Sequence, residues 1–379
     1  MKRILFLVLM LFDPLYGWAQ QQPKPTKPAT TSNGKTTKPS TGKPIAKPNT
    51  AENARNAPKA NTPPSKPVRA SKPTDKTVLA TTKLIVTASG GAKVYFSPDP
   101  TGAQVGKLTF GLFVEAKSRS EQKKKVAGVE DYWYQVPYGN NKVGWVFGAN
   151  VRAYSSENRD AVITEIMRPR MRSNAKTFTE EVEFYDFLAV AERETLNLDV
   201  KAELSLAHLV VLKRILKLIP MESREKQPYQ SWLVGNEKYL VYSEPTQAYY
   251  LRFDLLWDLE TQYRDLPFAE RIAYEAAITD LAGECEGYLV CTIGRLNMRE
   301  GRYLERYPTG VYVNDMMSKI ENAITKILSN TAAYTVPEQD KKDLRTELGF
   351  LREAVEKIEK AQKETILIGL NSLEESFLK

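Results

Sequence analysis

The sequence predicts a multidomain protein in which a small all-β barrel is followed by an all-α helical domain, after a disordered N-terminal tether. Three observations lead to this prediction. Residues 20–78 are rich in Pro and Lys, residues 79–154 hold short apolar runs separated by turn-forming residues, and residues 155–379 carry apolar residues at helical spacing. A chain of 379 residues has room for two or three domains.

The first 19 residues have the pattern of a secretory signal peptide. Two basic residues precede an apolar run over residues 4–12, and Gly17 and Ala19 place small residues where a signal peptidase cleaves. We expect cleavage after Ala19, which leaves Gln20 as the new N-terminus. The run is shorter than the roughly 20 residues that span a bilayer, and an uncleaved anchor is the alternative. The mature chain is therefore expected to be periplasmic or secreted, with no transmembrane segment.

The positive charge of the chain is confined to its N-terminal part. Of the formal net charge of +8, residues 20–78 carry +10 and residues 1–19 carry +1, so residues 79–379 carry −3. Since the folded part is faintly acidic and an exported chain rarely meets DNA, we do not expect nucleic acid as a partner.

Residues 20–78 are expected to be a disordered linker. They hold eleven of the 22 prolines, Lys-Pro recurs, and apolar side chains other than Ala are nearly absent. Such a segment cannot offset its ordering entropy by burial. A spacer is the favoured interpretation, and weak attraction to anionic wall polymers or lipopolysaccharide is the alternative.

Residues 79–154 read as a series of short strands. Gly, Asn and Pro clusters at residues 97–102 and 139–141 separate them, and a polar loop or hairpin tip is expected over residues 117–125. Short strands at this spacing, within about 70 residues, are typical of a small barrel. The expected strands cover residues 84–86, 94–96, 105–108, 111–116, 131–136 and 143–147.

Within this region, three motifs resemble those of bacterial SH3 domains. They are Lys93-Val94-Tyr95, Trp133-Tyr134-x-Val136 and Gly144-Trp145-Val146, and the resemblance covers residues 83–154. The usual Asn-Val-Arg opening of that family is replaced by Ala92-Lys93-Val94-Tyr95. The resemblance implies an SH3-like barrel that acts as a binding module, with a cell-wall peptide or an envelope protein as partner.

Aromatic residues of the barrel are candidates for ligand binding. Strand alternation places Tyr132 and Tyr134 on the face opposite Trp133, so a buried Trp133 would leave both tyrosines outward. The alternative is that most of these rings simply fill a small core. The candidate ligand-binding residues are Tyr95, Tyr132, Tyr134, Tyr138 and Trp145.

Residues 155–379 are expected to form seven to nine helices. Residues 344–358 carry apolar residues at a heptad spacing, and packing on the same domain is favoured over a dimeric coiled coil. Residues 300–304 and 307–312 are weakly similar to the helix boundaries of tetratricopeptide-like arrays. The expected helices include residues 178–194, 204–219, 247–263, 267–281, 311–328 and a last one from Pro337 through Ile358.

The two cysteines, Cys285 and Cys291, are expected to form a disulfide in an oxidising compartment. Six residues of continuous helix would separate their Cα atoms by about 9 Å, beyond the roughly 7 Å limit for a disulfide. The helix must therefore break, and Gly283 and Gly287 are placed to break it. Two separate buried thiols are the alternative.

The residues that catalysis needs are scarce. His208 is the one histidine and lies in an apolar helix, so neither a cysteine peptidase nor a zinc amidase is expected, and no metal or cofactor is predicted. Two carboxylates suffice for glycoside cleavage, for which Glu284 with Glu286 or Asp254 with Asp258 can be considered. Charged residues on helix faces are, however, usually just solvated.

The sequence thus predicts an exported, non-enzymatic binding or scaffold protein. An all-helical cell-wall lytic enzyme that uses carboxylates and is targeted by the SH3-like module is the first alternative. A purely structural envelope protein, whose barrel packs on the helical domain, is the second.

Overall fold

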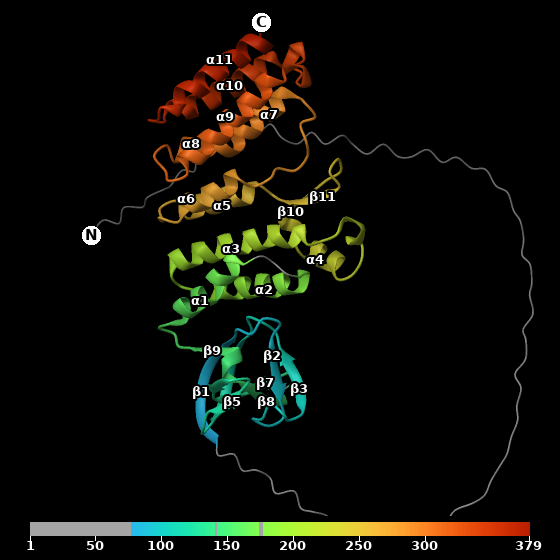
Figure 1. Cartoon of the computed structure of the whole chain (residues 1–379), viewed down its shortest axis with the longest axis vertical. Helices are drawn as coiled ribbons and strands as arrows, with labels where there is room; N and C mark the ends of the chain where they lie inside the picture. Colours follow the sequence, from blue (N-terminus) through green and yellow to red (C-terminus); the bar gives the residue numbers. More distant parts are fainter. Residues whose placement is uncertain (1–76, 141, 174–176) are drawn as a thin grey trace, which may run out of the picture. The chain divides into compact units, whose positions relative to one another are not determined.

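The computed structural model describes residues 77–140, 142–173 and 177–379, in which a β-rich region precedes a helical region (Figure 1). The expected signal peptide, its cleavage between Ala19 and Gln20, and nearly all of the tether lie outside the described residues. No helix among those described is both long and apolar enough to cross a membrane.

The β domain is built on a seven-stranded antiparallel sheet of order β3-β2-β8-β7-β4-β1-β9, with a separate hairpin of β5 and β6. The hairpin turns at Ala127 and Gly128, whose φ angles are +49° and +88°. The strands are β1 (Thr77–Val86), β2 (Ala92–Tyr95), β3 (Gln104–Leu108), β4 (Phe113–Ser120), β5 (Lys124–Val126), β6 (Val129–Asp131), β7 (Trp133–Tyr138), β8 (Lys142–Phe147) and β9 (Val151–Tyr154).

The β-rich region predicted from the sequence is present, but its strands do not close into a barrel in the described residues. Its edge strands β3 and β9 do not pair with each other in the described structure, so the sheet stays open. The helices pack against part of the β domain, because Ile85 and Phe110 belong to the main helical core. The predicted polar loop at residues 117–125 is also shorter, since β4 extends to Ser120 and β5 begins at Lys124.

Eleven α-helices are present in the described part of the chain, more than the seven to nine expected. The prediction for residues 178–194 is confirmed by α2, which Thr177 caps by accepting a hydrogen bond from the Glu180 amide at 3.2 Å. The helices are α1 (Arg159–Arg172), α2 (Phe178–Glu194), α3 (Leu198–Lys217), α4 (Tyr229–Gly235), α5 (Asp254–Gln262), α6 (Ala269–Ala277), α7 (Leu289–Leu296), α8 (Arg302–Arg306), α9 (Val313–Ser329), α10 (Lys341–Glu356) and α11 (Gln362–Phe377).

The helical region is not all-α, because a hairpin of β10 (Leu240–Ser243) and β11 (Ala248–Leu251) lies between α4 and α5. The helix expected over residues 247–263 therefore begins only at Asp254. Tyr242 in β10 and the consecutive Tyr249 and Tyr250 in β11 favour extended backbone, and Gln247 takes a positive φ of +48° in the turn. Helical periodicity in the second half of this segment concealed the strand in its first half.

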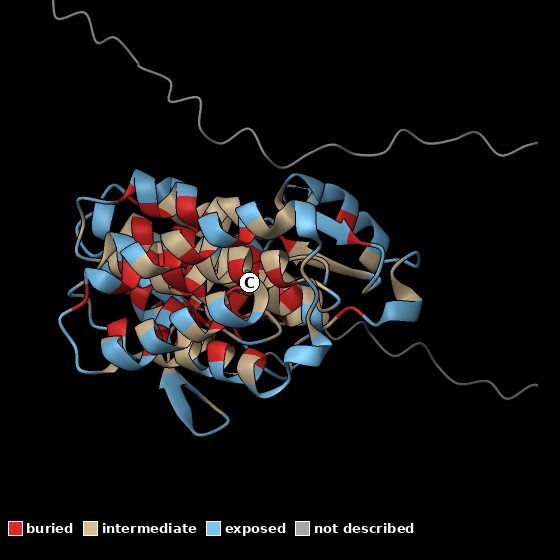
Figure 2. Cartoon of the chain, turned by 90° about the horizontal axis from the view of Figure 1, so that it is seen from above, coloured by how far each residue is buried: buried red, intermediate tan, exposed pale blue. Residues whose placement is uncertain are grey.

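Helices of the helical region pack mainly in pairs. The pairs are α2 with α3, α5 with α6, α9 with α11 and α10 with α11, and α7 also contacts α10. Figure 2 shows buried residues gathered on the inner faces of these helices. The expected heptad seam on α10 packs within the domain, because all five of its residues are 0 % exposed: Leu344, Leu348, Leu351, Val355 and Ile358.

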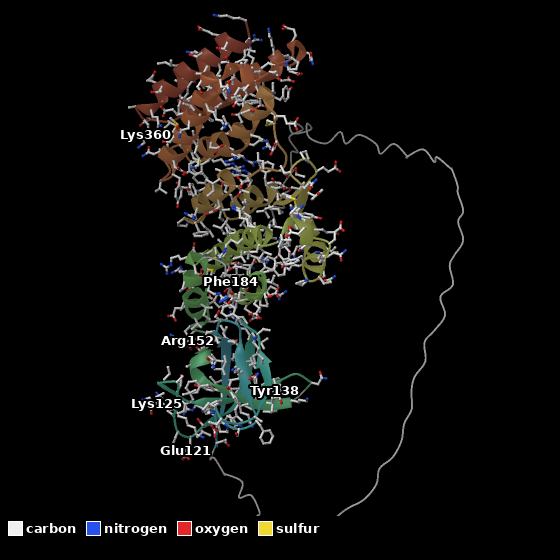
Figure 3. The ribbon with its side chains drawn as sticks, turned by 45° about the vertical axis from the view of Figure 1, so that its right-hand side comes forward. Glu121, Lys125, Tyr138, Arg152, Phe184 and Lys360 are labelled. Carbon is white, nitrogen blue, oxygen red and sulfur yellow. A yellow bond between two sulfur atoms is a disulfide. The ribbon has the colours of Figure 1, made fainter. Side chains whose placement is uncertain are left out.

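Aromatic rings join the β domain to α2. The ring of Phe110 lies 5.6 Å from that of Phe187 and 6.2 Å from that of Phe184, while Phe113 stacks on Phe187 at 6.2 Å. The guanidinium carbon of Arg170 lies 4.1 Å from the Phe110 ring centre. Phe184 is marked in Figure 3 beside the β domain. The β domain and helices therefore share one continuous apolar contact.

Candidate functional site

The five aromatic residues expected to bind a ligand do not share one face. Tyr134 and Tyr138 pack against the larger core of the β domain, around Val94 and Val136. Tyr95 and Trp145 belong to a second cluster with the fully buried Trp133, whose ring is 5.5 Å from that of Tyr95. Figure 3 marks Tyr138 on the β domain. Packing on both sides of the sheet separates the predicted residues.

Tyr132 occupies a third environment, under two basic side chains. The Arg119 guanidinium lies 3.9 Å from the Tyr132 ring centre and the Lys123 ammonium 5.4 Å from it. Nearby, burial raises the pKa of Tyr134 above its usual value, and the charge of Asp131 raises it further. Tyr134 is therefore a neutral phenol at physiological pH, and Tyr132 beside it contacts two positive charges.

Phe96, which the sequence predicts only as the last residue of a strand, is 76 % exposed. The turn that follows it is well supported. Asp99 accepts two hydrogen bonds from Thr101, both of 2.8 Å, and these bonds hold the pKa of the Asp99 carboxyl below its usual value. Lys124 donates to the Pro98 carbonyl at 2.9 Å. A large apolar ring is thus presented to solvent by a fixed turn.

His208 lies at an aromatic cluster in the helical region. Its ring centre is 4.0 Å from that of Tyr185, whose hydroxyl donates to Asn236 at 2.7 Å and whose ring is 6.0 Å from that of Trp232. The side chain is 14 % exposed, and Nε2 has no hydrogen-bond partner among the described residues. Burial, reinforced by the charge of Lys238, lowers the pKa of His208 to about 4. The imidazole is neutral at physiological pH.

The carboxylates considered for glycoside cleavage are not desolvated. Glu284, Glu286 and Asp258 are exposed, and Asp254 pairs with Arg252.

Buried carboxylates are instead found at Glu260, Glu300 and Glu181, which are 0 %, 3 % and 4 % exposed. Burial raises the pKa of Glu300, whose carboxylate lies 3.1 Å from Arg299.

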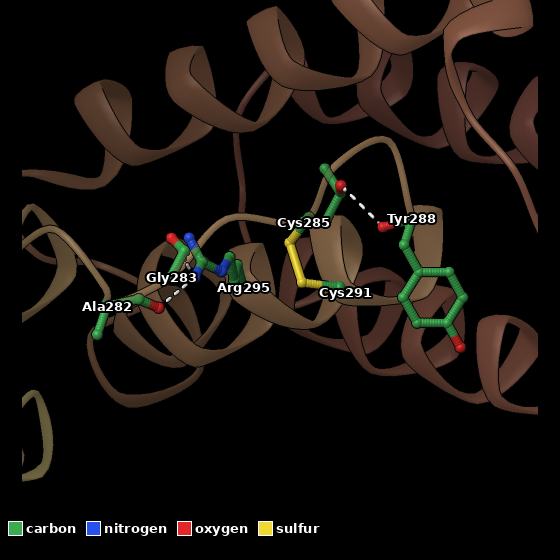
Figure 4. The surroundings of a disulfide bond; sticks show 7 residues. Ala282, Gly283, Cys285, Tyr288, Cys291 and Arg295 are labelled. Atoms are coloured by element: carbon green, nitrogen blue, oxygen red, sulfur yellow. Dashed lines mark hydrogen bonds between the residues drawn. A yellow bond between two sulfur atoms is a disulfide. The ribbon is translucent and has the colours of Figure 1, made fainter. Parts of the chain in front are cut away.

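The two cysteines lie at disulfide distance, with sulfurs 1.98 Å and Cα atoms 5.6 Å apart (Figure 4). Cys285 precedes α7 and Cys291 lies inside it, so no continuous helix joins the two cysteines, as the sequence predicted. Gly283 and Gly287, with φ of +78° and +79°, stand on either side of Cys285. The alternative of two separate thiols does not apply.

The described residues contain no group of three or more His, Cys, Asp or Glu side chains arranged to hold a metal ion. Comparison with protein-family models, with curated proteins and with solved structures finds no match for this chain. The chemistry of its own surfaces is therefore the basis for assigning a function.

Proposed function

We propose that this chain is an exported, non-enzymatic binding and scaffold protein of the cell envelope. Its β domain, which resembles bacterial SH3 domains, would dock on a cell-wall peptide or an envelope protein. The observation that carries the proposal is Phe96, an exposed ring on a braced turn. Apolar anchors of this kind contribute a large share of binding energy when a partner covers them.

The position of Phe96 suits a docking role. In the hairpin of β2 and β3, Ala92 pairs with Leu108 and Tyr95 pairs with Gln104. Phe96 therefore lies at one end of this hairpin, whereas Phe110, which contacts α2, follows the other end. A ligand at Phe96 would leave the contact with the helices undisturbed.

The aromatic contact with α2 supports the scaffold part of the proposal. Phe110 and Phe113 of the β domain both contact the Phe187 ring of α2, so the β domain has an apolar attachment point on the helices. The same contact is what a purely structural envelope protein would need. The exposure of Phe96 is what favours the binding protein in this proposal, because a partner that covers the ring would gain its burial energy.

The test is co-sedimentation of the chain lacking residues 1–19 with purified peptidoglycan sacculi, with released sugar and peptide measured. Phe96→Ala should lose most of the binding. Phe350→Ala, which removes a ring that is 55 % exposed on α10, should bind like the original chain. Release of sugar or peptide would support the lytic enzyme instead. Absence of binding would exclude the wall as ligand.

A further inference from the structure

A groove of about 260 Å³ lies between α1 and α3, away from the β domain surface that carries Phe96. Its lining combines apolar side chains with a charged rim, and residues from three separate segments contribute to it. Its lining residues are Met167, Arg168, Met171, Arg172, Glu203, Leu206, Ala207, Val210 and Phe268.

The floor of the groove is apolar and adaptable. Met167 is 1 % exposed and Leu206 is 5 % exposed, while Met171 and Phe268 are only partly buried. Methionine side chains are flexible and polarisable, so they adjust to the shape of an incoming group. The volume suits one large side chain rather than a long acyl chain, which favours a protein partner over a lipid.

The rim of the groove carries excess positive charge. Arg168 donates two hydrogen bonds of 2.9 Å to the Glu203 carboxylate, which neutralises that acid. Arg172, one helical turn further along α1, makes no ion pair within the described part of the chain. The positive charge of Arg172 is therefore available to a carboxylate of a partner.

The two kinds of side chain run in parallel along α1. Met167 and Met171 are four residues apart, and so are Arg168 and Arg172, so an apolar strip lies beside a strip of two arginines, of which Arg172 has no ion pair within the described residues. A helix with an apolar face edged by carboxylates matches both strips at once. We propose that this groove binds an acidic amphipathic helix of a partner protein, with one large apolar side chain seated between Met171 and Phe268.

The test is fluorescence anisotropy of the chain lacking residues 1–19 with a labelled helical peptide that has a leucine face edged by glutamates. A matched peptide with lysines in place of the glutamates serves as the comparison. The acidic peptide should bind at least about tenfold more tightly than the lysine peptide, since like charges at the rim oppose the latter.

Two variants locate the binding. Arg172→Glu should weaken the acidic peptide about tenfold, whereas Lys217→Glu, an equal change of charge at the exposed end of α3, should not. Met171→Glu should abolish binding, and circular dichroism would show whether it folds. If Met171→Glu does not fold, Arg172→Glu still tests the proposal, because Arg172 is exposed.

No binding by the original chain, equal affinity for both peptides, or equal effects of the two charge reversals would each overturn the proposal. Binding at this groove and binding at Phe96 can be tested separately, because the two surfaces share no residue.

Discussion

Gly111 of the β domain lies directly against Phe187 of α2. A Cβ at Gly111 would come within 2.4 Å of the Phe187 Cβ, and the φ of Gly111 is +75°. Glycine is thus required twice at this position, by the backbone conformation and by the close approach of the helix. The contact between β domain and helices depends on the absence of one side chain.

Gly111→Ala should therefore destabilise the protein and loosen the β domain from the helices. We expect a loss of about 2–4 kcal/mol, of which about 1 kcal/mol is backbone strain and the rest steric overlap. Gly128→Ala is a matched control, since Gly128 has a φ of +88° but nothing within 4 Å of the added Cβ. Urea unfolding of both variants measures the difference, and equal losses would contradict the interface as described.

Elements with strong local signals could be predicted, and those set by tertiary contacts could not. The periodicity of residues 178–194 and the cap at Thr177 agree, so α2 was predicted at its true bounds. The start of α3 at Leu198 lies six residues before the predicted one, because Asn197 caps a turn that is less apolar than the rest. The open sheet could not be predicted, because strand motifs indicate the strands and their turns but not whether the edge strands pair.

The candidate site shows the same division. Strand alternation allowed for a buried Trp133. The separation of Tyr95 from Tyr134 could not be predicted, because it depends on how the strands pair and on which side of the sheet each side chain lies. Phe96 was named only as part of a strand, and its position after Tyr95 and before Ser97-Pro98 was the available signal for an exposed ring. The groove on α1 needed α3 and Phe268 to be brought together by the fold.

The buried imidazole of His208 should make stability fall in acid. With its pKa at about 4 in the folded state and about 6.5 when unfolded, the unfolded chain alone takes up a proton between these values. Stability is thus lost as pH falls from about 6.5 to 4, by about 3 kcal/mol in total. Glu192 is 3.9 Å from Nδ1, too far to hydrogen-bond and reverse this effect.

The measurement is the free energy of unfolding of the original chain and of His208→Gln between pH 7 and 4. The original chain should lose more stability than the variant over this range, while other acidic groups affect both alike. Because His208 is the one histidine, its ring proton signals report the titration directly by NMR. A midpoint near pH 6.5, or parallel stability curves, would show that burial does not shift this group.

Reduction of the bond between Cys285 and Cys291 should lower stability by about 2 kcal/mol, because the bond restricts a short loop in the unfolded chain. The loop also docks on residues before α10, where the Thr335 amide donates to the Gly287 carbonyl at 2.9 Å. Melting temperatures with and without reductant test this, and a variant with both cysteines changed to Ser should be insensitive to reductant. An unchanged melting temperature for the original chain would argue against the bond.

Glu260 is 0 % exposed, and four side chains donate to its carboxylate, one of which is that of the neighbouring Thr261 at 3.3 Å. Tyr307 donates to it at 2.7 Å, Arg306 contacts it from a largely buried position, and Arg264, whose side chain is 52 % exposed, reaches it at 3.4 Å. Removal of a partner from a buried ion pair leaves a charge without compensation. The cost should therefore depend on which arginine is removed.

Arg306→Met should cost about 3–5 kcal/mol of unfolding free energy, whereas Arg264→Met should cost less than about 1 kcal/mol. Both changes keep an unbranched apolar stem, so the difference reports the charge at Glu260 rather than packing. Adding Glu260→Gln to Arg306→Met should recover part of the loss, because a neutral amide no longer requires a cation. Equal costs for the two arginines, or no recovery in the double variant, would mean that Arg306 stabilises α8 through contacts other than this carboxylate.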